Sequence, residues 1–128
     1  MRRYARLLAW VQGAYYAATG LWPLLSIGTF QAVTGPKHDL WLVRTVGALV
    51  LVIGGVLLVA AQRRAVTPEV ALLGSSSALA FSIVDVVFVS TRDVGAVYLL
   101  DAIPEIALVL AWGLAARRER PPAAPGEP

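Results

Sequence analysis

Apolar residues form four long runs along the chain, separated by short polar stretches. The runs lie near residues 7–28, 40–61, 69–90 and 94–116. Each is close to the ~20 residues that an α-helix needs to cross the ~30 Å hydrocarbon core of a membrane. Because the connections are short, neighbouring helices must run antiparallel. The pattern predicts an all-α fold, a four-transmembrane-helix antiparallel bundle forming a single domain over residues 1–116.

The composition agrees with this prediction. Of the 128 residues, 58% are hydrophobic and 15% are charged, and the mean hydropathy is +0.69, which lies outside the usual balance of a soluble domain. The chain has no cysteine and one histidine, His38, so thiol chemistry and a multi-histidine metal site are excluded. We expect no metal and no cofactor, and the lipid bilayer as the main partner.

Basic residues are concentrated on one side of the predicted bundle. Of the 11 Lys and Arg residues, all but Lys37, Arg44 and Arg92 lie in the N-terminal segment, the middle loop or the C-terminal tail. The positive-inside rule therefore places both termini in the cytoplasm, as expected for a multi-pass protein of the cell inner membrane. The net charge of +3 is explained by these basic residues beside the membrane. It therefore does not indicate a nucleic-acid partner. The proline-rich residues 117–128 are expected to form a disordered cytoplasmic tail.

Small residues form stripes on two of the predicted helices. They are Gly47, Gly54 and Gly55, around Leu51, in the second helix and Gly74, Ala78 and Ser82 in the third. In lipid, such stripes let helix backbones approach closely, so they are expected to face the bundle interior. Arg44 and Asp85 continue the two stripes and should therefore point inward as well.

Ionisable residues inside the predicted spans form a polar cluster. Asp101 and Glu105 lie four residues apart, on one face of the fourth helix. Arg44 is expected to pair with Asp85 and Asp101, which would offset the cost of placing these charges in the membrane. Glu105 is left without a cation and is expected to be protonated, with hydroxyls of the first helix as its partners. The predicted cluster comprises Arg44, Asp85, Asp101, Glu105, Tyr16 and Thr19.

Other polar and aromatic positions have simpler interpretations. Gln12 is expected to form hydrogen bonds between helices. The tryptophans mostly fall near helix ends and are interpreted as anchors at the membrane interface; they are Trp10, Trp22, Trp41 and Trp112. Between the first two helices, "TGPK" is a turn sequence in which Gly35 can take a positive φ. His38 and Asp39 follow it and are expected near the entrance to the polar cluster.

The segment "LWPLLSIGTFQAVTGPKHDLWLVRTVG", residues 21–47, resembles a segment found in a group of small uncharacterised bacterial four-helix membrane proteins. The layout of a kinked first helix, a Pro-Gly outer loop and three further spans is similar to that of DoxX-like proteins. The resemblance implies a four-span bundle in a bacterial inner membrane, and it implies no catalytic residue.

The prediction of function depends on the sequence motifs and on the polar cluster. No nucleophile set, phosphate-binding glycine loop or zinc-binding motif is present, so we do not expect an enzyme. We favour a structural or accessory membrane protein, and the alternative is a proton- or cation-coupled small-molecule carrier or binding protein that uses Asp85, Asp101 and Glu105. A homodimer or a larger membrane complex is the expected assembly. A free volume reaching Glu105 would favour the alternative, whereas Arg44 filling that volume would favour the accessory role.

Overall fold

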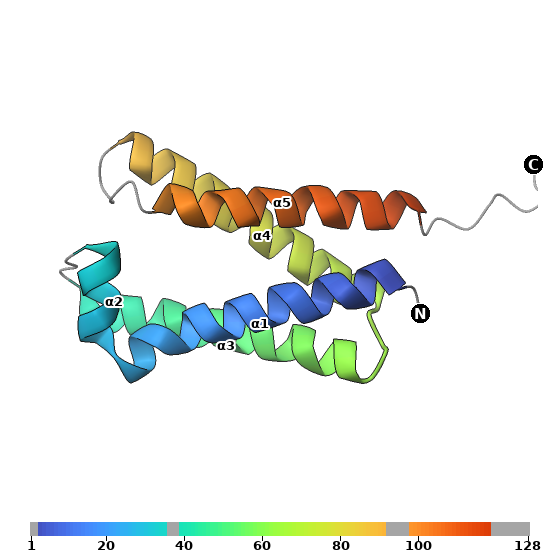
Figure 1. Ribbon diagram of the computed structural model, residues 1–128, viewed down its shortest axis with the longest axis horizontal. Coiled ribbons are helices and arrows are strands. Elements are labelled where there is room, and N and C mark those ends of the chain that lie inside the picture. The colour runs from blue at the N-terminus through green and yellow to red at the C-terminus, as the bar shows by residue number, and fades with distance from the viewer. Residues whose placement is uncertain (1–2, 36–38, 92–97, 119–128) are drawn as a thin grey trace, which may run out of the picture.

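A computed structural model describes residues 3–35, 39–91 and 98–118. This part of the chain is all-α and contains no strand. Its helices are α1 (Arg3–Leu25), α2 (Ile27–Thr34), α3 (Leu40–Gln62), α4 (Pro68–Ser90) and α5 (Tyr98–Arg118). The four long helices lie lengthwise beside one another and alternate in direction. The start of α1 and the end of α5 therefore lie at the same end of the molecule, opposite α2 (Figure 1).

Three of these helices, α3, α4 and α5, are long and apolar enough to cross a membrane. The outer surface also carries large apolar side chains. Leu72 of α4 and Ile103 of α5, for example, are 66% and 67% exposed. An outer surface with so many exposed large apolar side chains suits contact with lipid tails and would be costly in water. These properties indicate a membrane protein.

The short helix α2 replaces part of the loop expected after the first span. The first helix includes Pro23 but ends at Leu25, and Ser26 separates it from α2 with a φ of −150°. α2 ends where Gly35 takes the positive φ of 98° that the turn sequence predicts. Phe30 and Val33 of α2 turn toward the space between the long helices. An apolar eight-residue segment is too short to be recognised as a helix by its periodicity.

Helices α1 and α3 pack through glycines on both helices. A Cβ added at Gly20 would lie 2.5 Å from the carbonyl oxygen of Gly47, and one added at Gly54 would lie 2.8 Å from that of Gly13. Only glycine permits backbones to come this close, and van der Waals contact is the main source of helix association in lipid. Gly55 was expected to share this stripe, but it faces open space.

The α4/α5 pair closes the core at the end of the molecule where the chain termini lie. Gly74, Ala78, Ser82 and Asp85 of α4 are all buried, as the stripe predicts. A Cβ at Gly74 would lie 2.9 Å from the indole ring of Trp112. The core cluster there also includes Ala9 and Leu57, from the other pair. Trp112 is thus a core residue, which corrects its interpretation as an interfacial anchor.

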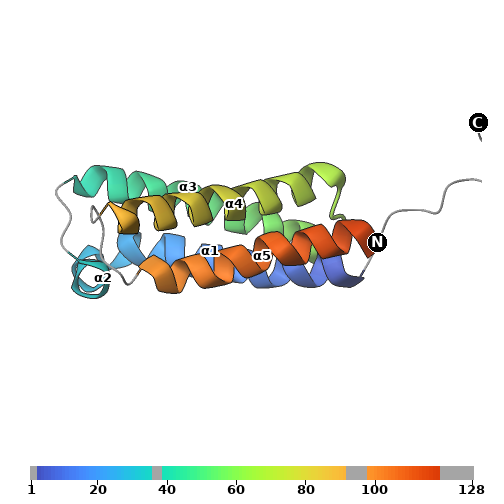
Figure 2. The same ribbon diagram turned by 90° about the horizontal axis from the view of Figure 1, so that it is seen from above.

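The two helix pairs are close at the end near the termini and diverge toward α2. Figure 1 shows α4 inclined against the other long helices, so that it approaches α1 near the termini and stands away from it near α2. The view from above shows α4 lying over α3 and α5 over α1 (Figure 2). The core occupies the converging end. The diverging end contains the cavity described next.

Candidate functional site

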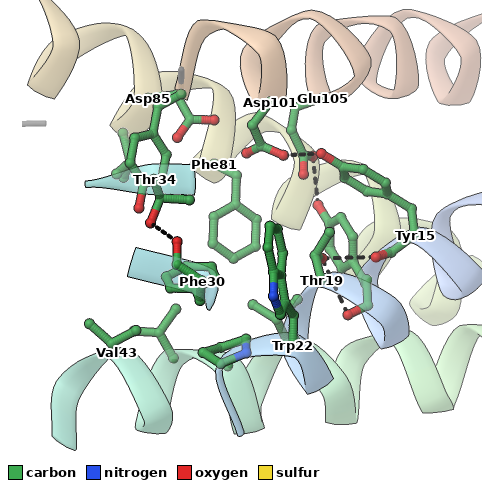
Figure 3. Close-up of a pocket in the computed structure, with 18 of the residues that line it drawn as sticks. Tyr15, Thr19, Trp22, Phe30, Thr34, Val43, Phe81, Asp85, Asp101 and Glu105 are labelled. Carbon is green, nitrogen blue, oxygen red and sulfur yellow. Dashed lines mark hydrogen bonds between the residues drawn. The ribbon is translucent and has the colours of Figure 1, made fainter. Parts of the chain in front are cut away.

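A cavity of about 450 Å³ lies between the two helix pairs, and α2 forms part of its wall. Most of its lining is apolar or aromatic. Its polar side chains come mainly from α1, α4 and α5 and include three acids. The lining residues with aromatic or carboxylate side chains are Tyr15, Tyr16, Trp22, Phe30, Phe81, Tyr98, Asp85, Asp101 and Glu105. Their arrangement is shown in Figure 3.

Two of the acids are held by tyrosines of α1. The hydroxyl of Tyr16 donates a hydrogen bond of 2.7 Å to Glu105 Oε2, and the hydroxyl of Tyr15 donates to Asp101 Oδ1. Glu105 is only 2% exposed, so its donor satisfies a group that is otherwise cut off from water. The expected contact between Tyr16 and Glu105 is present. These two bonds join α1 to α5 across the cavity.

Asp85 lies on the α4 side of the same cavity and is 5% exposed. Its Oδ2 atom is buried and, within the described part of the chain, has no hydrogen-bond partner. Asp101 and Glu105 are the acidic side chains near it, and the carboxyl group of Asp101 is within hydrogen-bonding reach, so the two aspartates can share a proton. In Figure 3 its carboxyl group lies on the same side of the cavity as these acids and away from Tyr15. The three acids thus differ in how they are satisfied.

Arg44 does not join the cluster, which corrects the ion pair expected with Asp85 and Asp101. Its side chain is exposed, it does not line the cavity, and no ion pair links it to a described acid. The reason is the rotation of α3, whose Gly47 and Gly54 face α1 and not the acids. Near the start of its helix, a long arginine side chain can also reach a polar interface at less cost than burial.

The remaining predicted site residues have separate places. Thr19 lines the cavity, but its hydroxyl donates to the carbonyl of Tyr15 over 2.8 Å and therefore does not serve Glu105. Asp39 is exposed and directly precedes α3. His38, the other expected entrance residue, lies outside the described residues.

Sequence reasoning missed several residues that shape the site. Tyr15 was not assigned to Asp101, although two adjacent phenols opposite two acids one helical turn apart are a usable signal. Trp22 was interpreted as an interfacial anchor, but it lines the cavity and packs edge to face with Phe30, their ring centroids 5.4 Å apart. Phe81 packs in the same way on Tyr16, at 5.6 Å. These aromatic contacts form much of the cavity wall.

A polar connection below the cavity fixes the positions of three helices. The Gln12 side chain donates to the carbonyl of Gly74 on α4 over 2.8 Å and accepts from Trp112 Nε1 on α5 over 2.7 Å. Gln12 is fully buried. It therefore provides the hydrogen bonding between helices expected from the sequence. The bonds anchor α1 to both helices of the other pair where the two pairs converge.

Comparison with known proteins gave no relatives. No protein family matches the chain, and no curated protein or solved structure is significantly similar to it. The resemblance to DoxX-like proteins therefore stays a prediction. Within residues 3–35, 39–91 and 98–118, no group of three His, Cys, Asp or Glu side chains is placed to hold a metal ion.

Proposed function

We propose that this protein is a small integral membrane protein that takes a small molecule into the cavity between its helix pairs, as a binding protein or a carrier. The observation that supports the proposal most is the free volume of about 450 Å³ that reaches Asp85, Asp101 and Glu105. Cavities that bind small molecules are commonly about 300–1,000 Å³ and mostly apolar, with a few polar groups.

The exposure of Arg44 also supports a binding role over the accessory role. An arginine filling the space between the acids would have made the cluster a purely structural ion-pair network. With Arg44 exposed, no arginine neutralises these acids, and their carboxyl groups remain available to a ligand in the cavity. Ionisable residues facing a cavity inside a membrane protein commonly mark a substrate or ion pathway.

In this proposal all four long helices cross the inner membrane, with both termini in the cytoplasm. The cavity then lies in the outer half of the membrane. The basic residues around Arg6, Arg63 and Arg118 would occupy the cytoplasmic side. A carrier would additionally need access from the cytoplasm. A homodimer of this short chain is the expected assembly for that role.

The proposal is tested by ligand binding to the protein in lipid nanodiscs, with a panel of small organic cations, anions and neutral amphiphiles. Val43 lines the cavity, so Val43→Trp should fill it and abolish binding. Val52 lies on the same helix and is 61% exposed, so Val52→Trp is the matched control and should bind as the natural chain does. Binding that survives Val43→Trp, or no binding by any compound, would favour the accessory role.

A further inference from the structure

Asp85 differs from the other two acids of the cavity because one of its oxygens lacks a donor. Asp101 and Glu105 each accept a hydrogen bond from a tyrosine of α1. Asp85 Oδ2 is buried and receives none from an N–H or hydroxyl group of the described residues, and the hydrogen-bonding neighbour of its carboxyl group is another acid, Asp101. A buried acceptor without a donor is unfavourable, because it has lost its hydrogen bonds to water without a replacement. A donor entering from the cavity would therefore be stabilised at Asp85 more than at the acids that are already satisfied.

The charge of the cavity selects the kind of donor. The acids Asp101 and Glu105 lie near Asp85, and the described lining residues include no Lys, Arg or His. A cationic donor would stabilise the ionised form of these carboxyl groups, whereas an anion would destabilise it. A charge-assisted hydrogen bond from an ammonium to a carboxylate is also stronger than a bond between neutral groups.

The aromatic side chains of the lining favour a ligand whose remaining atoms are apolar or aromatic. Trp22 and Phe30 form an edge-to-face pair on one side of the cavity, and Phe81 lies against Tyr16 on another. Figure 3 shows the rings of Trp22 and Phe81 in the space below the three carboxylates. Such rings bury apolar groups, and their faces attract cations. A fully hydrated inorganic ion would gain little from these walls.

We propose that the cavity binds an organic ammonium ion, a protonated primary or secondary amine on an apolar or aromatic body, with Asp85 as its counter-ion. The inference rests on the proposed function and specifies its ligand class. The ammonium donates to the carboxyl group of Asp85, and its body lies against Trp22, Phe30 and Phe81. Asp101 and Glu105 keep their tyrosine donors. Pairing with the ammonium offsets the cost of an ionised Asp85 carboxylate in a buried site.

The test uses 2-phenylethylammonium and propylbenzene, which have the same number of heavy atoms but differ in charge. Binding of each labelled probe to the full chain in nanodiscs is measured by equilibrium dialysis, with empty nanodiscs as the baseline. We expect the ammonium to bind at least about tenfold more tightly than propylbenzene. Asp85→Asn should weaken ammonium binding by at least about tenfold, which is about 1.4 kcal/mol, and change propylbenzene binding by less than about twofold.

Glu69→Gln is the matched control, because Glu69 is an exposed acid at the opposite end of α4. It should leave both affinities unchanged. Unaltered ammonium binding by Asp85→Asn would overturn the counter-ion role. If Asp85→Asn binds neither probe, Asp85 maintains the shape of the cavity and does not act as the counter-ion of the ammonium. Displacement of the ammonium by Mg²⁺, at concentrations too low to screen charge, would assign the site to an inorganic cation.

The same experiment separates this inference from the proposed function. If propylbenzene binds, Val43→Trp removes that binding and the ammonium does not bind, then the cavity is a binding site and the ammonium inference is wrong. If neither probe binds and no compound of the wider panel binds, both proposals are wrong.

Discussion

Trp112 donates its indole N–H to the side-chain oxygen of Gln12 over 2.7 Å, which joins α5 to α1 where the helix pairs converge. The same Gln12 side chain donates to the carbonyl of Gly74 on α4. One buried amide therefore connects three helices. With its amide satisfied on both sides, Gln12 fixes how the α1/α3 pair is set against the α4/α5 pair.

Gln12→Leu should consequently destabilise the protein. The change leaves the buried Trp112 N–H without an acceptor, which costs about 1–3 kcal/mol, and removes the second hydrogen bond of the Gly74 carbonyl, which keeps its partner within α4. The free energy of unfolding in mixed micelles measures the effect. Gln62→Leu is the control, because Gln62 is exposed at the end of α3. Equal stability of the two variants would show that the Gln12 bonds contribute nothing.

Gly20→Ala should separate α1 from α3. Its Cβ would lie 2.5 Å from the Gly47 carbonyl oxygen and 2.6 Å from the Leu51 nitrogen, both backbone atoms that cannot move aside. The matched change Gly55→Ala meets open space and should be neutral or stabilising by up to about 1 kcal/mol, because alanine favours helix over glycine. Thermal unfolding should rank Gly20→Ala below the natural chain and Gly55→Ala level with it or above. The reverse order would exclude glycine packing as the basis of this pair.

Tyr16→Phe should cost about 1–3 kcal/mol of stability, because it removes the donor of the buried Glu105 carboxyl group. Glu105→Gln should cost much less, since the amide oxygen can still accept from Tyr16. Tyr4→Phe is the control, because the Tyr4 hydroxyl makes an exposed contact with Arg118. Chemical unfolding of the three variants checks this order. A Tyr16→Phe variant as stable as Tyr4→Phe would contradict it.

Arg44→Ala should change the free energy of unfolding by no more than about 0.5 kcal/mol, the usual range for surface substitutions. Arg44 is exposed and forms no ion pair with a described acid. Removing it therefore takes no ion-pair partner from Asp85 or Asp101. Unfolding measured beside the natural chain tests this. A loss of several kcal/mol, the cost of breaking a buried pair, would restore the ion pair that the sequence had suggested.

Both chain termini should lie in the cytoplasm. Reporter fusions after Arg118 and within the "TGPK" loop should report opposite sides of the membrane, with the fusion after Arg118 inside, because most basic residues lie on the terminal side. An external C-terminus would reverse the orientation. The cavity would then open toward the cytoplasm instead of the outer face.

The sequence alone was enough to predict the long helices and much of their interior-facing surface. Length and hydropathy are local properties, so the four runs correspond to α1, α3, α4 and α5, with ends shifted by a few residues. The small-residue stripe from Gly74 to Asp85 is buried because the periodicity of one helix determines which residues share a face. The spacing of Asp101 and Glu105 likewise placed two acids on one face of α5.

Only the tertiary structure decided which face meets which neighbour. Gly47 and Gly54 could have faced any helix, and their packing against α1 is what turns Arg44 away from the acids. Trp112 lies near a helix end, as an interfacial anchor would, yet it is buried against Gly74. The unpartnered oxygen of Asp85 also depends on how far α4 stands from α1. Rotation and spacing of helices arise from contacts between residues distant in sequence. Hydropathy does not encode them, because buried and lipid-facing positions are both apolar.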